Sequence, residues 1–441
     1  MSIVLKGRML IYEDALLNNY GIRVENNRIA QIAPNKDLVC EEGDEIYELS
    51  DQIILPGFVN GHHHMYGTLS HGITADVMVS DFNNFLTDFW WKYVEDRVDH
   101  DLVRTTAKWA CVEMIESGIT SFMDILEGPG SIPGALQIEK EEIKKAGLRG
   151  FLSFEACQRV SAGNGLSGIR ENMDFVKLCS KDDLIKGLPS IHTLFTCDKE
   201  FVKRAKEEAD RYHCMLHMHL SESDYEPSWS LVHYGKRPVE VYEEWGILDQ
   251  NILASQVVAV TDEELDLLAK HHVSVISMPL SNCEVGGGIA PVSKMLERGM
   301  TVGLGTDGYI NNFFEICRGA FLIHKANEKN SQVMPAKTVY KLATSGGAKA
   351  MGIDAGELAV GKLADIIAVK IDTPTPINEH NVFEQLILFR NPADVKYVMV
   401  NGKLLKKDGK LITVEKEKCR MEMAEAAEKF WNNYDAGGEY I

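Results

Sequence analysis

Short apolar runs alternate with amphipathic segments through the middle of the chain. Eight runs are candidate strands, at 53–59, 121–125, 150–155, 185–192, 215–219, 252–258, 273–278 and 302–306. Apolar residues recur at helical spacing between them, at 102–117, 139–145, 200–212, 238–244 and 262–269. Strands that alternate with helices in this way form parallel sheets. Eight such units in series predict an α/β fold, a (β/α)8 TIM barrel, with its chemistry at the carboxyl ends of the strands.

Both ends of the chain have a β-rich pattern instead. Candidate strands lie at 2–12, 21–25, 29–32 and 45–55, and again at 364–370, 395–400, 403–406 and 411–414. Asn401-Gly402 and Asp408-Gly409 are typical hairpin turns. We therefore expect the two termini to pair into one small β-sandwich. The predicted domains are 1–55 and 362–414 for the two parts of this sandwich, 56–361 for the barrel, and 415–441 for a surface helix (416–434) and tail.

Composition narrows the class of protein. The 441 residues are 45% hydrophobic and 25% charged, as in ordinary enzymes, and the net charge is -19. Such an acidic body repels nucleic acids and anionic membranes, so neither is an expected partner. No apolar run is long enough to span a membrane. The apolar run at the N-terminus, residues 1–12, is short and is interrupted by Lys6 and Arg8, so it does not predict a signal peptide. Nine scattered cysteines without a Cys-x-x-Cys pair favour a reduced, cytoplasmic protein.

The first candidate site residues follow the strand at 53–59, in the run His62-His63-His64. In extended backbone, His62 and His64 point to one face and His63 to the other. Two neutral imidazoles on one face can bind one divalent cation. A histidine-rich turn without a metal is the alternative, and the triplet alone favours that alternative.

A second group of candidates lies in the run 216–222. His217 and His219 share a face, and His219 is nearer the strand end, so we expect it to be the metal ligand. His217 is expected to be a hydrogen-bonded core histidine. Glu222 follows where the strand becomes a loop, and a carboxylate beside an activated water can move its proton to a leaving group.

Asp307 supplies an acid at the end of the last candidate strand. Thr306-Asp307-Gly308 alone is also an ordinary turn. Together, His62, His64, His219 and Asp307 make a three-histidine, one-aspartate set that suits Zn or Fe. His192 ends the fourth candidate strand, where no lysine stands that could bridge two metals when carboxylated. We therefore expect one metal ion, zinc rather than iron, and either a substrate-contacting or a core role for His192.

Several motifs make the chain similar to the amidohydrolase superfamily. It most resembles the deaminase/chlorohydrolase branch, which contains adenosylhomocysteine, methylthioadenosine and guanine deaminases and triazine hydrolases. The resemblance spans almost the whole chain. It depends on His62 and His64 and on the runs Pro56-Gly57-Phe58-Val59-Asn60, His219-Leu220-Ser221-Glu222, Tyr234-Gly235-Lys236-Arg237-Pro238, Ser281-Asn282, Gly288-Ile289-Ala290-Pro291-Val292, Gly305-Thr306-Asp307-Gly308 and Gly361-Lys362-Leu363-Ala364-Asp365.

The resemblance implies the same barrel with a small β-sandwich, and it implies roles for these residues. Glu222 and Asp307 would be catalytic, with Glu222 as the proton shuttle. Asn282 would contact the substrate. A hydroxide on the metal would attack an amidine-like ring carbon of a purine, pterin, pyrimidine or triazine, and ammonia would leave.

One position departs from the family. Counting back from Thr261 puts Gln256 where the family has a histidine on its sixth strand. Glutamine can orient the water or contact the substrate but cannot be protonated at working pH. We expect Gln256 to act as a neutral orienting group. The alternatives are a catalytically impaired metal-binding homologue and a hydrolase of another C–N or C–Cl bond.

Other segments give weaker indications about substrate and assembly. Phe82, Phe85, Phe89 and Tyr93 recur at helical spacing, which suits a pocket wall, a core or a homodimer contact. Nucleoside-deaminating relatives bind ribose with an acid near the segment 81–85. Asn83-Asn84 here argues against a nucleoside substrate, although Asp81 is close by. Glu284 indicates a basic or amine-bearing substrate, and the glycine-rich run 161–168 is predicted to be a mobile lid.

Overall fold

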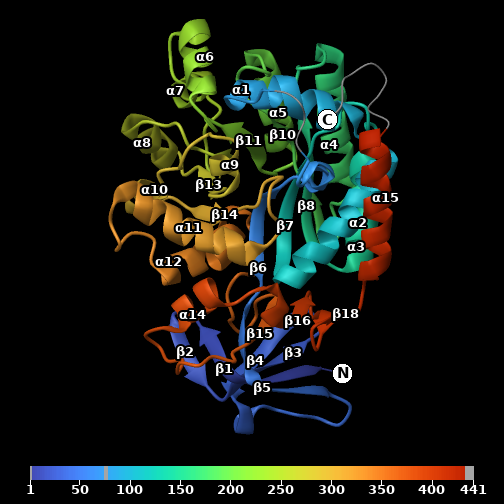
Figure 1. Cartoon of the computed structure of the whole chain (residues 1–441), viewed down its shortest axis with the longest axis vertical. Coiled ribbons are helices and arrows are strands. Elements are labelled where there is room, and N and C mark those ends of the chain that lie inside the picture. The colour runs from blue at the N-terminus through green and yellow to red at the C-terminus, as the bar shows by residue number, and fades with distance from the viewer. Residues whose placement is uncertain (1, 74–77, 433–441) are drawn as a thin grey trace.

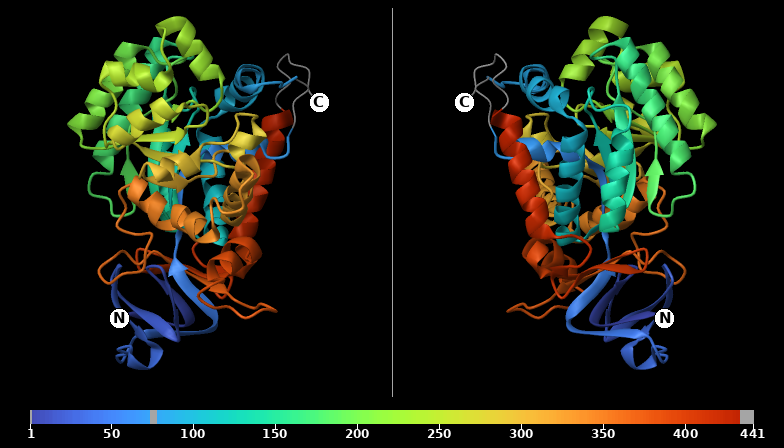
Figure 2. Two further views of the ribbon diagram at one scale, coloured as in Figure 1. Left: turned by 90° about the vertical axis from the view of Figure 1, so that its left-hand side faces the viewer. Right: turned by 90° about the vertical axis from the view of Figure 1, so that its right-hand side faces the viewer.

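The computed structural model describes residues 2–73 and 78–432. Figure 1 shows two parts, a barrel surrounded by helices and a smaller sheet domain below it that contains the N-terminus. The described C-terminal segment returns to the barrel, where the last helix lies along its side (Figure 2).

The barrel is one closed sheet of parallel strands. Its strands are β6 (Phe58–His63), β7 (Ile119–Leu126), β8 (Arg149–Ala156), β9 (Ile185–Gly187), β10 (Ser190–Ile191), β11 (Leu216–Leu220), β12 (Ile252–Gln256), β13 (Ser274–Ser277) and β14 (Val302–Leu304). Both β9 and β10 pair with β8, and β10 also pairs with β11. Strands β9 and β10 therefore occupy one strand position of the barrel. Pro189, which has no N–H to donate, lies between them. The predicted (β/α)8 fold is confirmed.

Helices cover the outside of the barrel and its ends. The larger ones are α2 (His100–Ser117), α3 (Ala135–Ala146), α4 (Ala162–Leu178), α5 (Lys199–Arg211), α6 (Tyr225–Tyr234), α7 (Pro238–Trp245), α8 (Asp262–Lys270), α11 (Phe313–Glu328), α14 (Val382–Phe389) and α15 (Lys416–Asn432). The shorter ones are α1 (Phe82–Asn84), α9 (Ser281–Glu284), α10 (Val292–Glu297), α12 (Ala336–Lys341), α13 (Gly347–Ala350), the π-helical η3 (Phe85–Val94) and η5 (Leu342–Gly346), and the 3₁₀ turns η1 (Asn35–Asp37), η2 (Met65–Ser70), η4 (Glu95–Arg97) and η6 (Pro392–Asp394).

Local sequence explains where these helices begin and end. At the start of α8, Thr261 accepts from the N–H of Glu264 while the Glu264 side chain reaches back to the N–H of Thr261. This capping box satisfies two N–H groups that a helix leaves free. Helix α2 begins with Asp99, which accepts from the N–H of Leu102, and ends at Gly118 with φ 84°.

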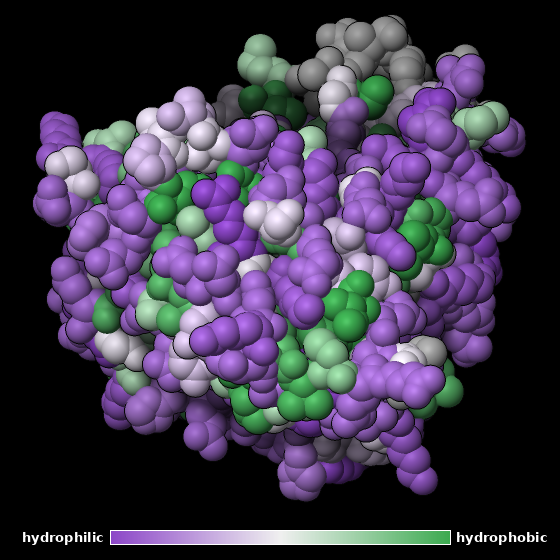
Figure 3. Space-filling view, turned by 90° about the horizontal axis from the view of Figure 1, so that it is seen from below, coloured by the Kyte–Doolittle hydropathy of each residue, from purple (hydrophilic) through white to green (hydrophobic). Residues whose placement is uncertain are grey.

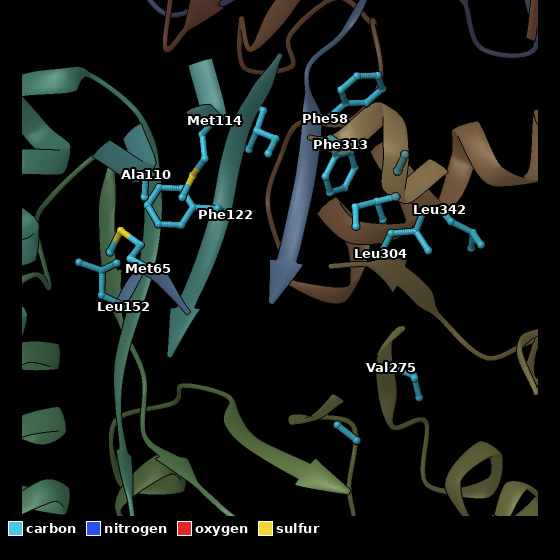
Figure 4. Close-up of a cluster of buried hydrophobic side chains, with 14 of the residues drawn as sticks. Phe58, Met65, Ala110, Met114, Phe122, Leu152, Val275, Leu304, Phe313 and Leu342 are labelled. Carbon is cyan, nitrogen blue, oxygen red and sulfur yellow. The ribbon is translucent and has the colours of Figure 1, made fainter. Parts of the chain in front are cut away.

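Apolar side chains fill the space between strands and helices. Figure 4 shows Phe58 on β6, Phe122 on β7 and Phe313 on α11 among these buried residues. The rings of Phe58 and Phe313 lie 5.4 Å apart. Burial of such side chains is the main favourable term in folding, and here it fixes the strand ends that carry the polar residues described below.

The small domain is a mixed sheet built from both ends of the chain. Its strands are β1 (Ile3–Tyr12), β2 (Ala15–Asn18), β3 (Tyr20–Glu25), β4 (Arg28–Pro34), β5 (Glu45–Pro56), β15 (Ile366–Lys370), β16 (Val395–Val400), β17 (Lys403–Lys407) and β18 (Lys410–Leu411). The two ends meet where β15 runs antiparallel to β5. The predicted pairing of the termini is therefore confirmed, whereas the exact domain boundaries stay a prediction.

A single glycine separates the two domains within the predicted strand at 53–59. The strand breaks at Gly57 into β5 and β6. A Cβ at Gly57 would lie 2.1 Å from the side chain of Thr120, so a larger residue there would require Thr120 to move. Across the same junction, Arg149 donates to Asp365 at 2.8 Å.

One prediction made from composition is wrong. Residues 162–168, predicted as part of a mobile lid, form the first turns of α4. A Cβ at Gly165 would lie 2.6 Å from the carbonyl oxygen of Cys157, and one at Gly168 would lie 2.9 Å from the ring of Phe154. These glycines therefore permit close packing instead of motion.

The predicted C-terminal surface helix is confirmed as α15, and its end is anchored to the barrel. In α15 the Trp431 side chain is buried and donates to the carbonyl oxygen of Leu69 at 2.7 Å. The last two residues of the predicted helix, 433 and 434, and the tail lie outside the described residues.

The surface agrees with the share of charged residues in the composition. Seen from the side of the small domain, charged and polar residues surround scattered apolar ones (Figure 3). Among the described residues, no helix combines the length and the apolar character that crossing a membrane requires.

Candidate functional site

The end of β6 directs its three histidines to two sides, as predicted. The Nε2 atoms of His62 and His64 lie 3.2 Å apart. His63 points the other way, with Nδ1 2.9 Å from Asp124 and Nε2 2.7 Å from Asn311. All three are buried. The His62 and His64 side is therefore the one that can share a ligand.

Hydrogen bonds indicate which nitrogens are free to bind it. His64 Nδ1 lies 2.6 Å from the carbonyl oxygen of Ile125, which can only accept, so Nδ1 carries the proton. His62 Nδ1 lies 3.1 Å from His217 Nε2, and His217 Nδ1 lies 2.7 Å from the hydroxyl of Ser190. With its proton on Nδ1, toward Ser190, His217 can accept at Nε2, so His62 can donate through its own Nδ1. Both Nε2 lone pairs then face each other, which is unfavourable unless a cation lies between them.

His219 completes the histidine group from β11. Ligand atoms of His62, His64 and His219 all lie within 4.8 Å of one another. Burial first, and neighbouring imidazoles second, lower the pKa of both His62 and His219 well below the usual value. These two rings are therefore neutral, which is the form that binds metals.

Asp307 approaches the group from the end of β14. Its Oδ1 lies 3.5 Å from His64 Nε2 and accepts from the N–H of Gly308 at 2.7 Å. The residue has φ 60°, a strained backbone of the kind that occurs at functional sites. The four predicted ligands thus converge in the structure.

The donor set fits a divalent cation. Zinc–nitrogen bonds are about 2.0–2.1 Å long, so one ion can contact both Nε2 atoms that lie 3.2 Å apart. Three imidazoles and one carboxylate are ligands that zinc and iron both accept.

Gln256 and Asn282 lie behind Asp307. Gln256 Nε2 donates to Asp307 Oδ2 at 2.8 Å, and Asn282 Nδ2 donates to Gln256 Oε1. Both side chains are fully buried, and neither is among the described residues that line the cavity. Gln256 therefore contacts a predicted ligand, while contact of Gln256 or Asn282 with water or substrate stays a prediction.

A cavity of about 460 Å³ opens beside the four converging residues. This volume suits a small-molecule ligand. The aromatic segment forms one wall, so Phe82, Phe85 and Phe89 line the cavity. Of the roles predicted for this segment, the pocket wall is confirmed for these three residues and the core role for Phe89 and Tyr93, whereas the homodimer contact stays a prediction. Asp81 instead accepts from the N–H of Asn84 and caps α1.

Glu222 and His192 both line this cavity, as predicted for catalytic and substrate-contacting residues. Burial first, and the charge of Asp307 second, raise the pKa of Glu222 well above the usual value. Burial lowers the pKa of His192 to about 4, so its ring is neutral. His192 Nδ1 lies 2.9 Å from the hydroxyl of Thr196, which leaves Nε2 available to a ligand.

Sequence reasoning missed a group of buried acids on the far side of His219. Glu95, Glu127 and Glu155 line the cavity, and Arg159 contacts the first two at 3.2 Å. Burial first, and Glu127 second, raise the pKa of Glu95 and Glu155 well above the usual value. The signal was present, because Glu155 lies at the end of β8 and Glu127 directly follows β7, as Asp307 follows β14.

Comparisons with known proteins agree with this geometry. Residues 53–405 match the model of the amidohydrolase family. The chain is 34% identical over 430 residues to a 5'-deoxyadenosine deaminase of Methanothermobacter thermautotrophicus, covering 95% of this chain and 97% of the relative. It is 32% identical over 416 residues to a 5-methylthioadenosine/S-adenosylhomocysteine deaminase of Thermococcus sibiricus, covering 92% and 94%. A solved adenosine deaminase from Xanthomonas campestris with bound zinc has a TM-score of 0.88 at 22% identity, covering 97% of this chain and 98% of that one.

Proposed function

Because this chain belongs to the amidohydrolase family, we propose that it is a metal-dependent hydrolase that deaminates an aminated nitrogen heterocycle and releases ammonia. The observation that carries the proposal is the convergence of three histidines and one aspartate beside a cavity. Glu222 reaches the same cavity from the strand that supplies His219. The proposed ligands are His62, His64, His219 and Asp307.

The chemistry divides between the ion and the protein. When bound, a divalent cation acidifies water and so provides a nucleophile near neutral pH. Glu222 moves the proton: it takes one from the attacking water and delivers it to the leaving amino nitrogen. Its raised pKa suits a group that must hold a proton between these two events. Asp307 accepts a hydrogen bond from Gln256, which fixes the direction of the carboxylate.

The cavity indicates the substrate class. Aromatic side chains along one wall suit a flat ring. The described residues that line the cavity include six acidic side chains and no lysine or arginine. A basic or donor-rich ring is therefore favoured over an anionic one. Adenine nucleosides come first because the two relatives named above are deaminases of such compounds, and pterins, pyrimidines and triazines complete the panel.

Zinc is the proposed ion. The donor set accepts it, and the structurally similar adenosine deaminase and an atrazine chlorohydrolase from Arthrobacter aurescens TC1 were both solved with zinc. A cytoplasmic location and a homodimer stay predictions from the sequence.

The test is ammonia release by the zinc-loaded protein on this panel. We expect turnover of at least one aminated ring and a product in which oxygen replaces the amino group. Glu263→Gln, on the exposed face of α8, is the matched control for substitutions at Glu222. Zinc-loaded protein that binds such rings and never converts them would overturn the proposal and favour the impaired homologue.

A further inference from the structure

Glu155 is a buried acid that the proposed chemistry does not use. Its Oε1 lies 2.6 Å from Nδ1 of His219. Glu155 is 2% exposed and His219 is 4% exposed. By hydrogen-bond geometry both atoms are unsatisfied among the described residues, so the contact is short but poorly aligned. Each of these two atoms is therefore the nearest possible hydrogen-bond partner of the other. A buried polar atom without a partner costs about 1–3 kcal/mol, so pairing the two atoms is favoured.

The barrel brings these two residues together across the short strand β10. Strand β10 pairs with β8 on one side and with β11 on the other, where Ser190 is opposite both Glu155 and His217. Glu155 and His219 thus approach from two strands that flank β10. Their contact depends on barrel closure, so it forms only in the folded chain.

Glu155 belongs to a group whose other members are held firmly. Glu127 Oε1 lies 3.2 Å from Arg159 Nε, and Glu95 Oε2 lies 3.2 Å from another nitrogen of the same guanidinium. Tyr66 donates its hydroxyl to Glu95 at 3.2 Å. The Arg159 guanidinium lies 4.8 Å from the Trp91 ring centre. In this packed group Arg159 forms ion pairs with Glu95 and Glu127, while Oε1 of Glu155 lies against His219.

We propose that Glu155 is a positioning residue that accepts a hydrogen bond from Nδ1–H of His219. This contact fixes the tautomer and the ring orientation, so that Nε2 faces His62 and His64. Histidines that bind metals typically donate their other N–H to a carboxylate or carbonyl in this way. His64 has the same arrangement with the carbonyl oxygen of Ile125. The inference rests on the metal site of the proposed function but not on its substrate.

The test measures zinc affinity by chelator competition with zinc alone, in the absence of any substrate. Glu155→Gln keeps the shape and weakens the acceptor, and Glu155→Leu removes it. We expect affinity to fall about 10-fold in Glu155→Gln and up to about 100-fold in Glu155→Leu, with one zinc still bound at saturation. The control is Glu142→Gln, because Glu142 is a buried acid on α3 paired with Arg104 and Lys145, away from the site.

A spectroscopic measurement covers the case in which a variant does not fold. In the unaltered protein labelled with ¹⁵N-histidine, we expect a protonated Nδ1 of His219 with a strongly downfield proton. The resonance is assigned by its loss in His219→Asn. A deprotonated Nδ1, unchanged zinc affinity in both folded Glu155 variants, or an equal loss in Glu142→Gln would each overturn the inference. If zinc affinity falls as expected but no ring is deaminated, the positioning role stands and the proposed function fails.

Discussion

The two faces of β6 carry the same kind of residue in opposite states. On one face, both nitrogens of His63 have partners, at 2.9 Å from Asp124 and 2.7 Å from Asn311. On the other, the Nδ1 atoms of His62 and His64 are used by His217 and by the carbonyl oxygen of Ile125, so the Nε2 lone pairs face each other at 3.2 Å. Burial is similar on both sides, so burial does not distinguish them. The difference lies in hydrogen-bond satisfaction: a satisfied buried histidine stabilises the fold, and an unsatisfied pair needs a ligand.

The largest expected effect comes from His64→Ala. It removes a proposed ligand, so zinc affinity should fall by more than about 100-fold. This loss is larger than the loss expected when a residue that only hydrogen-bonds a ligand, such as Glu155, is replaced. Deamination should fall to the level of metal-free protein. Zinc content by atomic emission and ammonia release measure both results. Full zinc binding in this variant would remove His64 from the ligand set.

Glu222→Gln should separate proton transfer from metal binding. Loss of a positioned acid–base group costs about 10²–10⁴-fold in kcat, while zinc content stays at the value of the unaltered protein. Steady-state kinetics with Glu263→Gln as control provide the comparison. Retained turnover in Glu222→Gln would assign the proton to another group.

His63→Ala should have the reverse pattern of His64→Ala. It removes the imidazole contacts of Asp124 and Asn311, although Asp124 still accepts from the N–H of Met65 and Asn311 still donates to Glu113. The loss of these two buried contacts should reduce the free energy of unfolding by about 3 kcal/mol. Denaturant unfolding of the metal-free protein measures this loss. Zinc stoichiometry should not change. If His63→Ala loses zinc instead of stability, the contrast between the two faces of β6 is wrong.

The sequence predicted the strand ends well because each polar residue interrupts an apolar run. His62, His219 and Asp307 were visible for this reason, whereas the position of Gln256 came from the family resemblance, by counting back from Thr261. Contacts across the barrel could not be predicted in the same way, because they depend on how the sheet closes into a barrel and on the register between neighbouring strands. The contact between Glu155 and His219 arises only when β10 pairs with both neighbouring strands.

Composition misled most where one residue type serves two purposes. Glycines in 161–168 resemble a flexible linker, yet Gly165 and Gly168 allow α4 to approach the backbone of Cys157 and the ring of Phe154. Nothing local in the sequence separates glycine used for motion from glycine used for close contact, because the distinction lies in the partner element.

The smallest expected effect concerns Gln256, which donates to Asp307 from behind the proposed ligand set. A hydrogen bond to a charged group is worth about 1.5–3 kcal/mol, and Asp307 keeps its bond from the N–H of Gly308. Gln256→Ala should therefore lower kcat by about 10-fold and leave zinc content unchanged. Gln256→His restores the residue that the family pattern has at this position and should keep a donor toward Asp307. If the unaltered protein is inactive and Gln256→His gains turnover, the glutamine marks an impaired homologue. If both are active, Asp307 needs only an oriented donor, and the proton work belongs to Glu222.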